Sequence, residues 1–184
     1  MRLDRLTRKT HEALQSAQHA ASERGNPELL PAHLLLSLLT QEDGVSGAVL
    51  RKAGVTDAAV IDQVRSAVEA APQVQGGNEP SLSRSMRDVM ARTWKETEAL
   101  GDEYSSAEHV LLAMVEDKGD AGKLLASAGL TRDKLLTALK QVRGTQKVTD
   151  QEPEARYEAL EKYTRDITAA AQAGKVDPVI GRDE

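Results

Sequence analysis

The sequence predicts an all-α protein in which two four-helix repeats are related by a pseudo-twofold axis and are followed by a flexible linker and one further helix. Three observations support this fold class. Hydrophobic residues, chiefly Leu, Ala and Val, make up 40% of the chain and charged residues 29%, a composition rich in strong helix formers. Aromatic residues make up only 2%, with no Phe, which disfavours a β-sandwich or barrel because strands favour aromatic side chains. The third observation is an internal repeat.

Residues 6–31 align with residues 82–107 at an offset of 76, and a one-residue deletion then changes the offset to 75. The shared landmarks are Gly25 with Gly101, His33 with His109, Ala53-Gly54 with Ala128-Gly129, and Val74 with Val148. Because the two segments share the positions of these landmark residues as well as their overall composition, we infer a duplication. Repeat 1 covers about 6–74 and repeat 2 about 82–143, and together they form a domain over residues 1–143.

The first two helices of each repeat follow from apolar periodicity. Residues 7–24 and 83–100 carry apolar or small side chains on one face, which is typical of a helix lying on a core. Residues 31–41 and 106–117 are apolar nearly all round, so we expect this pair of second helices at the shared centre. Pro31 suits a first helical turn, where its missing N–H costs nothing.

Glycines and hydroxyl side chains predict the remaining boundaries. The third helix should end at Gly54 or Gly129 in a left-handed conformation, and Thr56 and Thr131 should cap the fourth helices at 57–70 and 132–142. The stretch Ser105-Ser106-Ala107-Glu108 has the capping-box spacing, with Glu108 at N3.

The C-terminal part has a different composition. Residues 144–153 are polar and predict a mobile linker. A lone helix is expected at about 153–173, followed by an extended tail. We interpret residues 154–184 as the truncated start of a second domain.

Composition also limits the function. The formal net charge is −5, which disfavours nucleic acid or an anionic membrane as the partner. The chain has no Cys, no apolar run long enough for a membrane span and no visible secretory signal, so a soluble cytoplasmic protein is expected. No phosphate-loop or zinc-protease motif occurs. We therefore expect neither catalysis nor a metal site in these residues, and His33 and His109 are interpreted as packing or capping residues.

The residues that remain point to a binding surface. Thr7 and Ser83 each begin a first helix, where they can cap it or help to hold an anion. Asp102 and Glu108 have the uncharged mates Asn26 and Ala32 in repeat 1, and this asymmetry favours a function over a shared structural role.

An apolar groove is expected beside these acids, lined by Met86, Met90 and Trp94, the only Trp. Met is a soft, adaptable lining. The alternative is that Trp94 packs at the edge of the apolar stripe.

Parts of the chain resemble the double Clp repeat domain of the Clp/heat-shock ATPases, and its tail resembles the lead-in to their first ATPase module (AAA+ nucleotide-binding domain). These parts are Met1-Arg2-Leu3-Asp4-Arg5-Leu6-Thr7, Pro31-Ala32-His33-Leu34-Leu35-Leu36 with Ala107-Glu108-His109-Val110-Leu111-Leu112, Gly101-Asp102-Glu103-Tyr104, and the tail from Tyr157 to Asp166 and from Gly174 to Glu184. The resemblance covers essentially the whole chain and favours the ClpB-type disaggregase branch.

The resemblance implies a substrate-receiving amino-terminal domain that binds exposed segments of unfolded or aggregated polypeptides and passes them to an ATPase ring. The parent would be a homo-hexamer that uses ATP and Mg²⁺ and works with the DnaK chaperone system under heat stress. Thr7, Asp102 and Glu108 fall on the family's substrate-handling positions, and Val179 and Ile180 fall on its adenine-contacting segment. The fragment alone would be a monomer without a cofactor.

Two alternatives remain open at this point. The domain could be the adaptor-docking module of a ClpC- or ClpA-type unfoldase that serves a protease. It could also be a stand-alone helical enzyme or scaffold.

Overall fold

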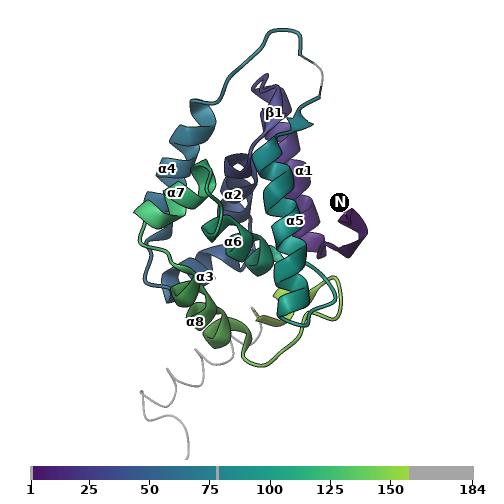
Figure 1. The fold of residues 1–184 in the computed structure, drawn as a ribbon, viewed down its shortest axis with the longest axis vertical. Helices are drawn as coiled ribbons and strands as arrows, with labels where there is room; N and C mark the ends of the chain where they lie inside the picture. Colours follow the sequence, from purple (N-terminus) through teal and green to yellow (C-terminus); the bar gives the residue numbers. More distant parts are fainter. Residues whose placement is uncertain (1, 78, 158–184) are drawn as a thin grey trace, which may run out of the picture.

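Two sets of four α-helices make up most of the residues that the structure describes. The structure is a computed structural model, and it describes residues 2–77 and 79–157. The first set is α1 (Arg8–Glu23), α2 (Pro31–Thr40), α3 (Ser46–Lys52) and α4 (Asp57–Glu69), and the second is α5 (Arg84–Ala99), α6 (Ala107–Val115), α7 (Asp120–Ser127) and α8 (Arg132–Arg143). A short 3-10 helix, Leu3–Arg5, precedes α1. The all-α class and the four-helix repeats are confirmed (Figure 1).

Backbone pairing between the repeats obeys a pseudo-twofold relation. The short strands β1 (Glu28–Leu29) and β2 (Ser81–Leu82) run parallel, with Leu29 opposite Leu82. The offset of 76 turns this pair into Ser105 and Leu6, which form a parallel bridge of their own. Helix contacts are exchanged in the same way, because α3 packs on α8 and α4 packs on α7.

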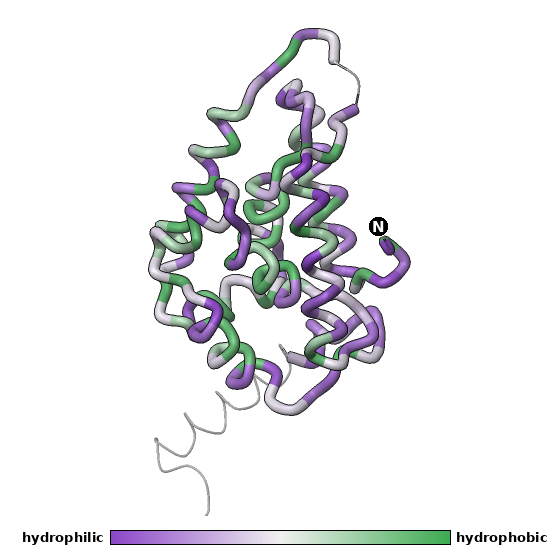
Figure 2. Tube along the Cα trace, viewed as in Figure 1, coloured by the Kyte–Doolittle hydropathy of each residue, from purple (hydrophilic) through white to green (hydrophobic). Residues whose placement is uncertain are grey.

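The two second helices lie at the centre of the fold, as their all-round apolar character predicts. Leu34 and Leu35 of α2 and Leu111 and Leu112 of α6 are fully buried. In Figure 2 the central α2 and α6 are among the most hydrophobic stretches of the tube. Each first helix packs on its own second helix, α1 on α2 and α5 on α6. The outer faces of α1 and α5 are thereby left for other contacts.

Most of the expected helix ends are present, and one cap differs. Gly54 and Gly129 have φ of +79° and +81°, the left-handed conformation that only glycine adopts readily. Thr131 caps α8 by accepting a hydrogen bond from the Lys134 amide at 3.3 Å. Thr56 precedes α4 but makes no side-chain cap bond, because the neighbouring Asp57 carboxylate accepts from the Ala58 amide instead.

The capping box of α6 uses a histidine in place of the expected Glu108. Ser106 is the N-cap, so the N3 position falls on His109. The Nδ1 atom of His109 accepts from the Ser106 amide at 2.9 Å, and Nδ1 of His33 accepts from the Leu30 amide at 3.0 Å in repeat 1. The interpretation of both histidines as capping residues is confirmed. Glu108 does not take part in the capping box.

Residues 144–153, which their polar composition predicts to be a mobile linker, contact the repeats at two points. The Val148 side chain is fully buried, and the Val148 carbonyl accepts from the Glu103 amide at 2.9 Å. The Gln151 carbonyl accepts from the Arg8 amide at 2.8 Å. The stretch is therefore anchored to the repeats at Val148 and Gln151, while most of its residues are exposed and it has no regular secondary structure.

The last described residues, 153–157, are helical, in agreement with a helix beginning near 153. The rest of that expected helix, the tail, and Val179 and Ile180 lie outside the described residues. Within residues 2–77 and 79–157, we find no helix with the length and apolar character of a membrane span.

Candidate functional site

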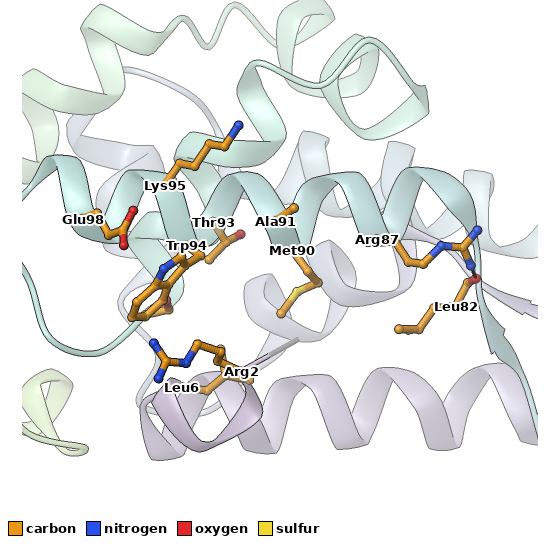
Figure 3. Close-up of a pocket in the computed structure, with 11 residues that line it drawn as sticks. Arg2, Leu6, Leu82, Arg87, Met90, Ala91, Thr93, Trp94, Lys95 and Glu98 are labelled. Carbon is orange, nitrogen blue, oxygen red and sulfur yellow. Dashed lines mark hydrogen bonds between the residues drawn. The ribbon is translucent and has the colours of Figure 1, made fainter.

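A groove of about 530 Å³ lies between the N-terminal segment and one face of α5. Its lining residues are Arg2, Leu6, Leu82, Arg87, Met90, Ala91, Thr93, Trp94, Lys95, Glu98 and Ser105. The groove exists because the amphipathic α5 turns one face toward α6, while the N-terminal segment passes beside an adjoining face (Figure 3). It brings together two parts of the chain that are about 80 residues apart.

Met90 and Trp94 form the apolar centre of the groove. They are four positions apart on α5 and therefore neighbours on one helix face. Met90 is almost buried, whereas Trp94 is half-buried and its indole ring faces the groove. The Arg2 guanidinium carbon lies 5.3 Å from the centre of that ring, a cation–π distance. Trp94 thus offers an apolar surface to the groove, and the exposed Arg2 side chain lies over it.

Met86 does not line the groove, contrary to expectation. Its side chain is fully buried in the core, and its amide donates to the Ser83 hydroxyl at 3.1 Å. Met86 lies one turn before Met90, at the cap of α5, where the helix meets the rest of the fold. Of the three expected lining residues, Met90 and Trp94 are correctly placed.

Asp102 lies inside the domain and not at the rim of the groove. Its carboxylate accepts from the Arg143 guanidinium at 2.7 and 2.8 Å, from Nε2 of His109 at 2.8 Å and from the Val148 amide at 2.9 Å. Burial by itself raises the pKa of Asp102, but the hydrogen bonds from His109 and Arg143 outweigh it and hold that pKa well below its usual range.

The same polar connection exists in repeat 1 with an amide in place of the acid. The Asn26 side-chain oxygen lies 3.1 Å from Nε2 of His33, and the Asn26 amide donates to the Pro72 carbonyl at 2.8 Å. An uncharged residue suffices there because Val68 occupies the position that Arg143 holds in repeat 2. The asymmetry between the repeats therefore has a structural reason, and the functional interpretation of it loses its support.

Glu108 is also buried, with only 1% of its side chain exposed. Its Oε1 atom lies 3.5 Å from the Arg143 guanidinium. Neither carboxylate oxygen has a hydrogen-bond partner within residues 2–77 and 79–157. Glu108 is thus a buried acid that balances part of the charge of Arg143 without a hydrogen bond between the two side chains.

Thr7 caps α1 and holds a carboxylate of the chain itself. Its hydroxyl accepts from the Thr10 amide at 3.4 Å and donates to Oε1 of Glu154 at 2.7 Å. Burial raises the pKa of Glu154 to about 7, and the charge of Glu108 adds to the effect. The group that occupies this helix start is therefore the Glu154 side chain, which follows the polar stretch 144–153.

Thr7, Asp102 and Glu108 thus lie in one buried polar cluster together with Arg143 and Glu154. None of these five residues lines the groove. The acidic residue that lines the groove is Glu98. The sequence analysis did not identify Glu98, Arg2 or Arg87 as lining residues. The conspicuous signal for the groove was Trp94 itself, a large apolar residue at the edge of the α5 stripe. The opposite wall could not be anticipated, because it needs the Leu6–Ser105 bridge.

Comparisons with known proteins agree with this fold. The family described as Clp repeat (R) N-terminal domain matches residues 5–128. Two proteins named chaperone protein ClpB are each 43% identical to this chain: that of Corynebacterium efficiens over 180 residues, 97% of this chain and 21% of the relative, and that of Bacillus anthracis over 187 residues, 100% and 22%. The chain spans about a fifth of the length of these relatives.

Two solved structures share the architecture. The Hsp104 N-terminal domain from Candida albicans superposes with a TM-score of 0.71 at 22% identity, covering 81% of this chain and 98% of that one. The N-terminal domain of the ClpV1 ATPase from E. coli gives a TM-score of 0.67 at 22% identity, covering 82% and 92%. At this level of identity the likeness concerns the fold.

Proposed function

This chain belongs to the Clp repeat (R) N-terminal domain family, and we propose that it receives exposed segments of unfolded or aggregated polypeptides in the groove along α5. The observation that carries the proposal is Trp94. In a domain that encloses nearly all of its large apolar side chains, this ring faces an open groove beside Met90. A folded protein hides its apolar segments, so such a surface favours chains that expose theirs.

The chemistry of the groove suits a receiver of many sequences. The centre is apolar, and Met90 can adjust its shape to different side chains. A volume of about 530 Å³ accepts a few side chains at a time and lies within the range of ordinary ligand pockets. Contacts of this kind tolerate sequence variation, whereas a site built from fixed hydrogen bonds would select one partner.

We propose further that the whole protein is a hexameric ATP-dependent disaggregase of the ClpB type. Its close relatives are named ClpB chaperones and are about five times longer than this chain, so the ATPase modules would follow residue 184. ATP and Mg²⁺ would bind there, Val179 and Ile180 would contact adenine, and cooperation with the DnaK system would take place in the cytoplasm. The alternative is an adaptor-docking domain of a ClpC- or ClpA-type unfoldase.

A direct test uses the single Trp of the chain as its reporter. We expect a Trp-free denatured model protein to change the emission of Trp94 on titration, because the ring becomes covered. In a parallel anisotropy titration, Trp94→Ala should weaken binding about three- to tenfold, as removal of a central aromatic contact does. The matched control is Val74→Ala, which truncates an exposed apolar residue outside the groove.

Equal affinities of wild type and Trp94→Ala would refute the proposal. Binding of one folded adaptor, with no binding of denatured chains, would favour the protease-linked alternative.

A further inference from the structure

The groove has a cationic lining although the chain as a whole is acidic. The lining residues include three cations, Arg2, Arg87 and Lys95, and a single carboxylate, Glu98. The whole chain, in contrast, has a formal net charge of −5. All four side chains belong to exposed residues. Within the described part of the chain, none of them takes part in a salt bridge. The positive charges of Arg2, Arg87 and Lys95 are therefore not neutralised by a salt bridge within the described residues.

Two of the cations mark the two ends of the apolar centre. Arg2 lies over the Trp94 ring at one end, and Arg87 lies beside Leu82 at the other, with its guanidinium donating to the Leu82 carbonyl (Figure 3). Met90 lies between them. Arg87 and Trp94 are seven residues apart on α5, which corresponds to roughly 10 Å along a helix. An extended chain covers that distance in about three residues.

The other two charged residues have smaller parts. In Figure 3 the Lys95 side chain points away from Arg2, on the opposite side of α5, so it adds to the local potential without closing the groove. Glu98 lies next to Trp94 in the same view. Its charge reduces the attraction for an anion at the Arg2 end, and no second carboxylate belongs to the lining residues.

Resting on the proposed function, we propose that the groove selects extended segments in which two or three apolar residues are flanked by acidic side chains. The apolar residues occupy the centre beside Met90 and Trp94. The flanking carboxylates meet Arg87 at one end and Arg2 at the other. Segments flanked by Lys or Arg are disfavoured because they bring like charges to both ends.

The test compares peptides that share one apolar centre, Leu-Val-Leu, and differ only in flanking residues: Glu, Gln or Lys. Each is titrated into the 184-residue chain and followed by the anisotropy of a dye on the peptide. We expect the Glu peptide to bind about five- to tenfold more tightly than the Gln peptide, and the Lys peptide to bind most weakly. The spread should narrow between 0.05 and 0.5 M salt, because exposed charges are screened.

Variants assign the preference to its residues. Arg87→Gln and Arg2→Gln should each lower the ratio of Glu-peptide to Gln-peptide affinity by about two- to fivefold. Glu98→Gln should raise that ratio. Lys52→Gln is the matched control, since it removes an exposed positive charge of α3 outside the groove, and the ratio should not change.

Tight binding of the Gln peptide with no preference for Glu flanks would overturn the selectivity and leave the proposed function standing. A preference for Lys flanks would overturn it in the same way. Failure of all three peptides to bind would refute both the selectivity and the proposed function.

Discussion

The guanidinium of Arg143 and the carboxylate of Asp102 form a bidentate ion pair inside the second repeat, with N–O distances of 2.7 and 2.8 Å. Both side chains are buried. The pair joins the end of α8 to the loop between α5 and α6, and His109 and the Val148 amide complete the set of donors to Asp102. Asp102 is consequently a residue of the fold, and its substitution is a poor probe of ligand binding.

Asp102→Ala should destabilise the domain by about 3–5 kcal/mol, because it leaves the buried charge of Arg143 without its main partner. The measurement is the free energy of unfolding in urea. Asn26→Ala, the equivalent change in repeat 1, removes no charge and should cost only about 1–2 kcal/mol. Equal losses for the two variants would contradict the assigned role of the ion pair.

The same ion pair gives the stability a definite pH dependence. The pKa of Asp102 is lower in the folded protein than its ordinary value of 3.8, so its contribution is present above that value and is lost as the pH falls. The difference in stability between wild type and Asp102→Ala should therefore be constant near neutral pH and shrink below about pH 4. A difference that does not change with pH would show that Asp102 is not preferentially ionised in the fold.

The contribution of Glu154 to the stability of the fold has the opposite pH dependence. Its pKa rises from 4.5 to about 7 in the folded protein, so the folded state is favoured most below 4.5 and loses stability as the pH rises through 7. Glu154→Gln cannot ionise, and at pH 8 it should be more stable than wild type by about 1–3 kcal/mol. At pH 4 the two should be alike. Glu152→Gln, at an exposed neighbour, is the control, and parallel stability profiles for wild type and Glu154→Gln would exclude a buried ionisable Glu154.

The helix pattern was predictable because each signal for it is local. Apolar periodicity defined α1 and α5, and the glycines at 54 and 129 defined two helix ends without any knowledge of packing. The Asp102 cluster was not predictable in this way, because its partners come from α6, α8 and the stretch after α8. The match of Val148 with Val74 in the repeat favours an end of repeat 2 at Val148 in place of the predicted end at residue 143.

Gly129 should tolerate Asn better than Ala. Its φ of +81° lies where a Cβ atom is strained, so Gly129→Ala should cost about 1–2 kcal/mol. Gly129→Asn should cost less, since Asn enters the left-handed region more readily. Thermal unfolding of both variants gives the comparison, and an Asn variant less stable than the Ala variant would contradict the assigned conformation.

Docking of residues 145–152 can be followed by proteolysis. Lys147 is exposed, but the next residue, Val148, is buried and bonded to Glu103 and Asp102, so trypsin should cut slowly after Lys147. Val148→Ala removes apolar contact worth about 2 kcal/mol and should accelerate this cut about tenfold or more. Val74→Ala should leave the rate as it is. Rapid cleavage after Lys147 in the wild type would contradict this docking and support the prediction of a mobile linker.

The groove was only partly predictable from the sequence. Met90 and Trp94 were found because they continue a helical stripe, and Met86 was misplaced because periodicity alone does not separate the centre of a stripe from its edge. Arg2 and Leu6 could not be assigned, since their position depends on a bridge to Ser105 across the molecule.

The most direct test of the account is a map of the residues that respond when a denatured, Trp-free polypeptide is titrated into the ¹⁵N-labelled chain. We predict that amide signals change along the groove-facing side of α5, from Arg87 to Glu98, at Leu82 of β2, and in the segment from Arg2 to Leu6. Changes confined to α4 and α7, or to residues 145–157, with the α5 face unaffected, would contradict the assignment of the groove as the polypeptide-binding site.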